Sequence, residues 1–146
     1  MKTRLGGFLS GFATSVSPWR PRGQAYPTLQ AFDLKRVAGQ SGLYAVWHLG
    51  VRPRWLRFGG AADLGAALTR VRVLPEVEDA VAHDGVYLAW ALLPVGEIPA
   101  ALASLNTMLR PYLYALDVAG EIKAAARAEA AFPLPPGTQS SVPPAA

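Results

Sequence analysis

The sequence predicts a small α+β domain, an α/β sandwich in which helices pack against a small mixed sheet that contains a β-hairpin. The chain has 146 residues, which is about the length of one domain. Hydrophobic residues make up 51% of it and charged residues 16%, a balance that supports a buried core and excludes a disordered chain. Segments of β type alternate with segments of helical apolar spacing, in the order (α)-β-β-α-β-α.

A helix and a β-hairpin are expected first. Thr28 can cap a helix over residues 28–38, where apolar side chains recur at helical spacing. Residues 42–48 are rich in aromatic and β-branched side chains, and residues 54–58 alternate charged with apolar ones. Two such segments, separated by a turn that contains glycine and proline, are typical of a hairpin.

A short helix and a third strand are expected next. Residues 60–70 are rich in alanine, with leucines on one face, and predict the helix. Residues 86–93 are apolar on both faces, as in the central strand of a sheet. The acidic run at residues 76–79 lies between them and is expected in a solvated loop.

Two helices are expected in the last third of the chain. Leucines recur at helical spacing over residues 97–116, where Pro99 suits the first turn and Pro111 should kink or end the helix. The alanine-rich residues 120–132 predict a further helix.

The composition of the two ends predicts where the domain begins and ends. Residues 1–27 combine glycines with a proline-rich stretch and are expected to form an arm and an extended connector. Residues 28–132 are then the single folded domain. Residues 133–146 have the proline-rich composition of a disordered tail.

Several classes of function are excluded by composition. The chain has no cysteine, which excludes disulfides, iron–sulfur clusters, thiol catalysis and cysteine-zinc sites. Its two histidines, His48 and His83, lack the spacing of a metal site. No apolar run is long enough to span a membrane. We therefore expect no cofactor, no membrane partner and a cytoplasmic location.

The charges are divided unequally along the chain. Residues 1–75 contain eleven Lys and Arg against two acids, and residues 76–146 contain three against eight. A basic first half favours an anionic partner, nucleic acid above all. The alternative is that the two halves interleave in space and their charges neutralise each other.

Two sequence blocks resemble those of the GIY-YIG nuclease superfamily. Residues 42–44 read Gly-Leu-Tyr, and residues 57–64 read Arg-Phe-Gly-Gly-Ala-Ala-Asp-Leu, at a spacing that suits the family's hairpin. The resemblance covers residues 40–116 and implies a GIY-YIG-like fold, with DNA repair or recombination as the setting. The positions that match the family's motifs are Gly42, Tyr44, Gly59 and Asp63.

Departures from the family pattern argue against catalysis. Arg57 stands where the family has its second tyrosine. Counting along the chain places Ala67 where the family has an arginine for the phosphate, and Leu102 where it has a metal-binding glutamate. Without these groups the water and the developing charge lack their stabilising partners. The resemblance therefore implies a degenerate, non-cutting domain, and a Mg²⁺ requirement only if the chain is an active nuclease.

We expect the hairpin and the following helix to bind nucleic acid, DNA in preference to RNA. Guanidinium groups suit phosphates, and tryptophans suit base stacking. The candidate residues are Arg52, Arg54, Arg57, Arg70, Arg72, Trp47 and Trp55. The simpler interpretation is that the tryptophans lie in the core and the arginines in water.

Two alternatives stay open. The chain could be a protein–protein interaction or dimerisation module that uses the helices expected at 97–116 and 120–132. It could also be an active endonuclease in which Arg70 and Glu97 replace the missing arginine and glutamate; the weak catalytic candidates are then Tyr44, Arg70 and Glu97.

Overall fold

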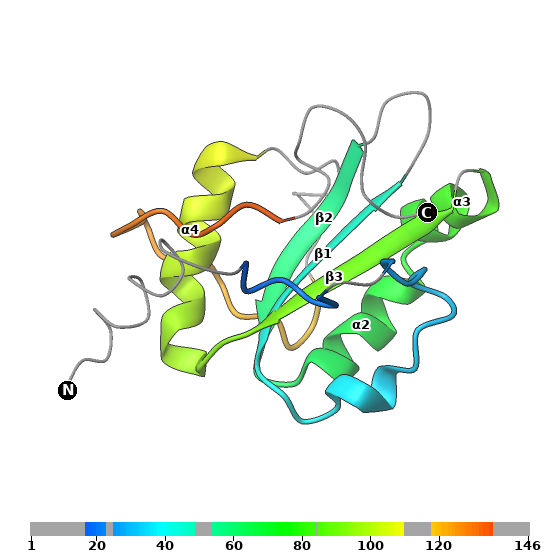
Figure 1. Ribbon diagram of the computed structural model, residues 1–146, viewed down its shortest axis with the longest axis horizontal. Helices are drawn as coiled ribbons and strands as arrows, with labels where there is room; N and C mark the ends of the chain where they lie inside the picture. Colours follow the sequence, from blue (N-terminus) through cyan, green and yellow to red (C-terminus); the bar gives the residue numbers. More distant parts are fainter. Residues whose placement is uncertain (1–16, 23–24, 49–53, 84, 110–117, 136–146) are drawn as a thin grey trace.

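A three-stranded antiparallel sheet lies between helices in the computed structural model, which describes residues 17–22, 25–48, 54–83, 85–109 and 118–135 (Figure 1). The strands are β1 (Gly42–His48), β2 (Arg54–Ala61) and β3 (Val86–Leu92), in the order β2-β1-β3. The helices are α2 (Leu64–Arg72), α3 (Pro75–His83) and α4 (Ile98–Met108), with 3₁₀ helices η1 (Leu34–Val37) and η2 (Val95–Glu97). The predicted α+β class is confirmed.

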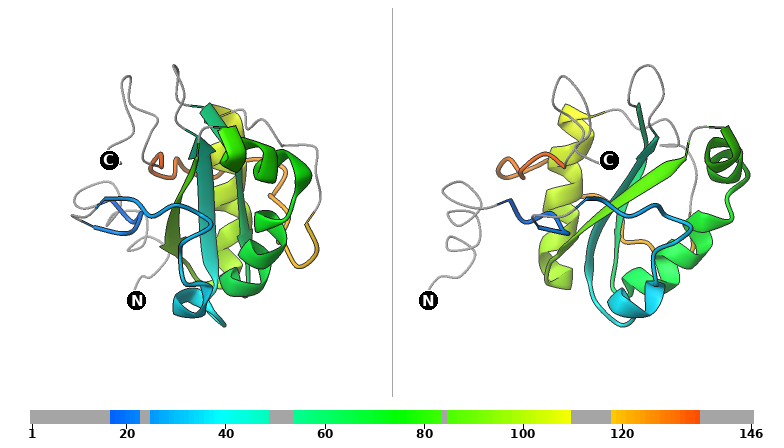
Figure 2. Two further views of the ribbon diagram at one scale, coloured as in Figure 1. Left: turned by 90° about the vertical axis from the view of Figure 1, so that its right-hand side faces the viewer. Right: turned by 45° about the vertical axis from the view of Figure 1, so that its right-hand side comes forward.

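The helices cover both faces of the sheet and create two hydrophobic cores (Figure 2). On one face, side chains of α2, α3 and η1 pack against the sheet, and Tyr44 and Leu88 belong to this core. On the other face α4 packs against the sheet, and Leu43 and Ala45 belong to this second core. Alternation along β1 therefore sends successive side chains into different cores, which explains why the whole strand is apolar.

The sheet is antiparallel throughout, which corrects the expected mixed sheet. β1 is the central strand and pairs antiparallel with both β2 and β3. β2 and β3 consequently run parallel to each other, but β1 lies between them. The connection through α2 and α3 carries the chain across β1, so no parallel pair forms among the described strands.

β3 lies at the edge of the sheet rather than at its centre, although it is apolar on both faces. Residues 17–22 and 25–29 flank its outer edge, where Arg20 bridges to Trp90 and Thr28 bridges to Tyr87. The N–H group of Leu88 also donates to the Pro27 carbonyl, 2.9 Å away. This flanking chain, expected as a connector and a helix, covers β3 as a further strand would.

The helix predicted over residues 28–38 is wrong in extent. Thr28 pairs with β3, and a turn follows before η1 begins after Asp33. The Asp33 carboxylate accepts a hydrogen bond from the Lys35 N–H group and caps η1. Pairing with the sheet thus prevails over helical spacing in this segment.

The acidic run at residues 76–79 belongs to α3 and not to a loop. Pro75 is the first residue of the helix, and Glu76 and Glu78 lie in its first turn. These positions favour proline and acidic residues respectively, because of the unpaired N–H groups and the helix dipole. Val77 is buried and attaches the helix to the core.

The helix predicted over residues 120–132 is absent, and residues 118–135 form an extended strap. Gly120 has a φ of 89°, outside the helical region. The Ile122 N–H group donates to the Gly60 carbonyl, and the Ala125 N–H group donates to the Pro99 carbonyl. The strap therefore connects β2 to α4 through backbone hydrogen bonds that a helix would use internally.

None of the helices in the described ranges has the length and apolar character that crossing a membrane requires.

Asp63 supports the start of α2, and its removal should reduce stability in a pH-dependent way. Its carboxylate accepts hydrogen bonds from the N–H groups of Gly39 (2.9 Å) and Ala66 (3.2 Å), and these bonds lower its pKa. The stabilisation is present above the unfolded-state pKa of about 3.9 and is lost as the pH falls through the lower folded-state pKa. We expect Asp63→Ala to lower the melting temperature by a few degrees at pH 7.

Thermal unfolding followed by circular dichroism from pH 7 to pH 3 measures this effect. The difference between Asp63→Ala and the parent chain should shrink below pH 4. Glu129→Ala, which removes another exposed carboxylate, serves as the control and should show no such difference. An equal loss at pH 3 and pH 7 would contradict the capping role.

Candidate functional site

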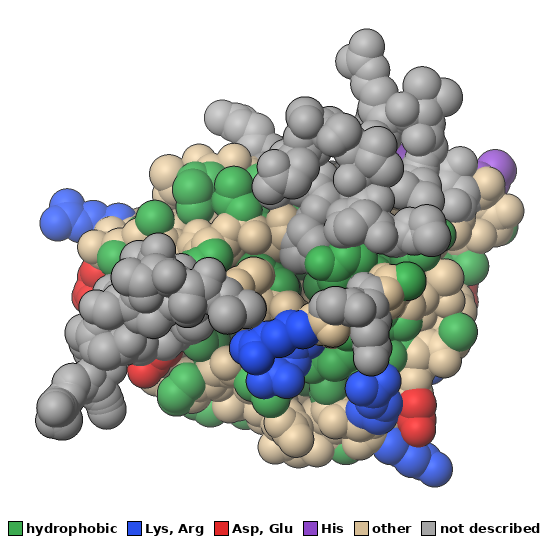
Figure 3. Space-filling model, in the orientation of Figure 1, with side chains coloured by type: hydrophobic (Ala, Val, Ile, Leu, Met, Phe, Trp, Pro, Cys, Tyr) green, Lys and Arg blue, Asp and Glu red, His purple; other side chains and the backbone are tan. Residues whose placement is uncertain are grey.

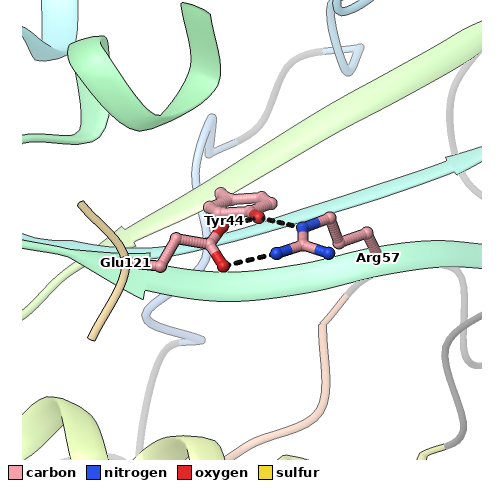
Figure 4. A network of polar contacts seen from close by, with 3 residues as sticks. All are labelled: Tyr44, Arg57 and Glu121. Atoms are coloured by element: carbon pink, nitrogen blue, oxygen red, sulfur yellow. Dashed lines mark hydrogen bonds and ion pairs between the residues drawn. The ribbon is translucent and has the colours of Figure 1, made fainter. Parts of the chain in front are cut away.

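Tyr44, Arg57 and Glu121 form a buried polar cluster on the face of the sheet that α2 covers (Figure 4). Tyr44 lies on β1, Arg57 lies on β2, and Glu121 lies on the strap. Arg57 Nε donates to Tyr44 Oη over 2.6 Å, and Arg57 Nη2 forms an ion pair with Glu121 Oε1 over 2.5 Å. Tyr44 Oη donates to the other carboxylate oxygen of Glu121.

A β-bulge in β2 explains why Arg57 points into this core. Val46 is opposite Arg57, whereas the next residue of β1, Trp47, is opposite Trp55. Leu56 is therefore the extra residue of the bulge, and both Leu56 and Arg57 face the α2 side. Tyr44 is opposite Gly59, so Tyr44 and Arg57 are diagonal neighbours on one face.

Gly59, one of the residues that match the family motif, provides the space for the cluster. A Cβ atom at position 59 would lie 2.8 Å from Glu121 Oε2 and 2.9 Å from Tyr44 Oη. Gly42, another motif residue, lies close to β3, and a Cβ atom there would lie 2.2 Å from the Ala91 carbonyl oxygen. Both glycines are thus required by packing.

The electrostatics of the cluster keep Tyr44 protonated. Burial raises the pKa of its hydroxyl well above the usual value, and Glu121 raises it further while Arg57 opposes the shift. Burial acts to lower the pKa of Arg57, but Tyr44 and Glu121 hold it above its usual value. The cluster therefore contains a neutral phenol, a guanidinium and a carboxylate whose two oxygens both accept hydrogen bonds. It is suited to holding the strap in place.

The structure separates Tyr44 from the position at which the family's glutamate was expected. Leu102 is buried in the core on the α4 side of the sheet, opposite to the face that carries Tyr44. Ala67 is also buried, in α2. Counting from Pro111 could not identify Glu121, which is 77 positions from Tyr44 and lies in a segment expected to be helical.

Several predicted contact residues serve the fold. Trp47 is 1% exposed, and its ring lies against those of Tyr26, Trp55 and Tyr87. Arg72 donates to the carbonyls of Leu29 and Phe32, at 2.7 and 2.8 Å.

The other predicted residues occupy different environments. Arg70 is exposed and donates to the carbonyl of Ala66 within α2. Glu97 ends η2, away from the cluster, and its buried Oε1 has no hydrogen-bond partner among the described residues. Arg52 and the side chain of Arg54 lie outside the described residues.

The described residues contain no group of three or more His, Asp or Glu side chains that could hold a metal ion.

The chain matches no protein-family model, no curated protein and no solved structure. The resemblance to GIY-YIG nucleases therefore stays a prediction from the residues of the two blocks.

A second feature is a group of cations near the outer edge of β3, which we call the β3-edge face. Arg20 and Arg22 belong to the segment that flanks β3, and Lys35 and Arg36 belong to η1. Arg20 exchanges backbone hydrogen bonds with Trp90, and the Arg36 guanidinium lies 5.7 Å from the centre of the Trp90 ring. Figure 3 shows Lys and Arg side chains gathered on the lower half of this side of the molecule.

Removal of Glu121 should destabilise the fold strongly. Glu121→Ala removes one partner of the ion pair with Arg57, a residue that is 4% exposed. We expect a loss of about 3–5 kcal/mol in the free energy of unfolding, because removing one partner of a buried ion pair is costly. Urea denaturation measures it. The double variant Arg57→Met with Glu121→Leu should recover most of the loss; a loss below 1 kcal/mol for Glu121→Ala would contradict the role of the pair.

The close approach at Gly59 gives a second test of the cluster. Gly59→Ala inserts a methyl group against Glu121 and Tyr44, and we expect it to cost about 1–3 kcal/mol. Gly96→Ala is the matched control, because a Cβ atom there meets no atom within 4 Å. Both are measured by urea denaturation, and equal stability of the two variants would show that position 59 has spare room.

Proposed function

We propose that the chain binds nucleic acid, DNA in preference to RNA, through the β3-edge face and does not cleave it. The observation that carries the proposal is an excess of positive charge near one sheet edge, formed by Arg20, Arg22, Lys35 and Arg36. The same segments contain one acidic residue, Asp33. Clustered Arg and Lys are the usual electrostatic footprint of a phosphate-binding surface.

The geometry of the face supports binding to a phosphate backbone. Arg36 lies over the rings of Phe32 and Trp90, which restrains its guanidinium at the surface. Arg20 is held by backbone pairing with β3. Cations on restrained segments lose less conformational entropy on binding than those on loose chains. Arg70 is exposed too, but its guanidinium lies beside Gly120 of the strap and so does not belong to the β3-edge face.

The proposal moves the phosphate contacts away from the arginines of the hairpin and of α2. Arg57 and Arg72 donate their hydrogen bonds inside the fold, so their guanidinium groups are engaged there. The cations of the β3-edge face replace them in the proposed interface.

The buried cluster supports binding without cleavage. Tyr44 stays protonated, and the oxygens of Glu121 are both occupied by Arg57 and Tyr44. These groups therefore lack the proton-accepting capacity that activation of a water requires. A setting in DNA repair or recombination, and the preference for DNA, rest on the GIY-YIG resemblance alone.

Fluorescence anisotropy with labelled DNA tests the proposal. Affinity should fall steeply with salt, because bound phosphates release counterions. Arg22→Gln with Lys35→Gln should weaken binding and reduce the slope of log K against log salt by roughly 1 to 2. The control, Lys123→Gln with Arg127→Gln, removes two exposed cations of the strap and should change the slope less.

Two outcomes would contradict the proposal. Absence of binding at 50 mM salt would favour the alternative of a protein partner or a homodimer. Cleavage of the labelled DNA on addition of Mg²⁺ would show that the chain is a nuclease.

A further inference from the structure

We infer that the nucleic acid is single-stranded and that its bases stack on a row of aromatic side chains at the hairpin end of the sheet. We call this group the aromatic row; its members are Tyr26, Trp47, Trp55 and Tyr87. The inference rests on the proposed function and specifies the form of nucleic acid that the surface recognises.

The row crosses all three strands on the α4 side of the sheet. Trp47 on β1 is opposite Trp55 on β2 and Tyr87 on β3. The ring centres are 5.3 Å apart for Trp47 and Trp55, and 6.2 Å apart for Trp47 and Tyr87. Tyr26 meets Trp47 edge-on at 5.4 Å. These are the separations of packed aromatic pairs, so the rings support one another.

Trp47 forms the buried base of the row, and the other rings reach the surface. Trp47 is 1% exposed, whereas Tyr26, Trp55 and Tyr87 are half-buried. Nearer to α4, the same face carries small residues such as Ala45 and Ala89, which pack in one core with side chains of α4. The large rings are therefore placed where the face is only partly covered.

The indole N–H group of Trp47 is a second observation that points to a ligand. It is buried and has no acceptor among the described residues. A buried donor without a partner costs about 1–3 kcal/mol. A base edge or a phosphate oxygen brought against the row, with a small displacement of the Tyr26 or Trp55 ring, would supply the missing acceptor.

Arg20 and the aromatic row meet at the outer edge of β3, close enough to share one strand of nucleic acid. Arg20 pairs with Trp90, and Thr28 pairs with Tyr87, so the two pairings are three residues apart on β3. That separation is about 10 Å along a strand. Arg36 lies over the Trp90 ring on the α2 side, the face opposite to the row, so Arg20 and Arg22 are the cations that the strand would share with the rings. Cations that follow the backbone beside rings that accept bases are the arrangement by which proteins bind single strands. In a duplex the bases are already stacked and cannot reach the rings.

Equilibrium binding to a labelled single-stranded oligonucleotide and to the duplex of the same length tests the inference. The variants are Trp55→Leu and Tyr87→Leu, which keep an apolar side chain but remove the ring. Their matched controls are Trp55→Phe and Tyr87→Phe, which keep a ring at the same position. All are measured at 50 mM salt, with thermal unfolding to show that each variant is folded.

We expect the parent chain to bind the single strand at least tenfold more tightly than the duplex. Each leucine variant should weaken single-strand binding about tenfold, in line with the usual worth of one stacked base, and leave duplex binding unchanged. The phenylalanine variants should retain most of the affinity. Equal affinity for both forms, or equal behaviour of the leucine and phenylalanine variants, would overturn the inference.

The same data distinguish failure of the inference from failure of the proposed function. Salt-dependent binding of both forms that requires Arg22 and Lys35, but not the rings, would leave the proposed function intact and remove the stacking. Absence of binding to either form at 50 mM salt would remove both.

Discussion

The buried ion pair between Arg57 and Glu121 is the interaction on which the rest of the architecture depends. A guanidinium inside a core is tolerated only when its charge and its donors are satisfied, and here a carboxylate and a phenol supply both. The requirement reaches far along the chain. Position 59 must lack a side chain. The strap must be extended, although its composition favours a helix, so that Glu121 can pair with Ala61 of β2.

The strap in turn determines which surfaces of the domain stay open. The strap hydrogen-bonds to β2 and α4. The Trp19 indole donates to the Pro133 carbonyl, which connects the segment that flanks β3 to the end of the strap. The α4 side is thereby covered over much of its length. The outer edge of β3 is flanked by the segment that carries Arg20 and the exposed Arg22, and the binding proposed for the β3-edge face rests on this arrangement.

The elements that follow from local pattern were predictable, and those set by distant partners were not. The hairpin, β3, α2 and α4 have the alternation or helical spacing expected of them, and the sequence located the main part of each. The helix expected at residues 60–70 begins only at Leu64, because Gly60 and Ala61 belong to β2. Of the helix expected at residues 97–116, Ile98–Met108 is helical and residues 110–117 lie outside the described residues. Residues 120–132 have a helical composition, but pairing with Gly60 and Pro99 prevails over it. Glu121 had no recognisable signal, because its partner Arg57 is 64 positions away. The side-chain alternation of a regular strand also fails to predict that Arg57 faces the core, because the β-bulge at Leu56 changes the face to which Arg57 points.

Mapping of backbone amide shifts by NMR during titration with a single-stranded oligonucleotide tests the central claim most directly. The account predicts that shifts concentrate in residues 17–22, in η1 and in β3 around Tyr87, while amides of α4 and α3 change little. Shifts confined to α4, or an unchanged spectrum at saturating oligonucleotide and low salt, would contradict it.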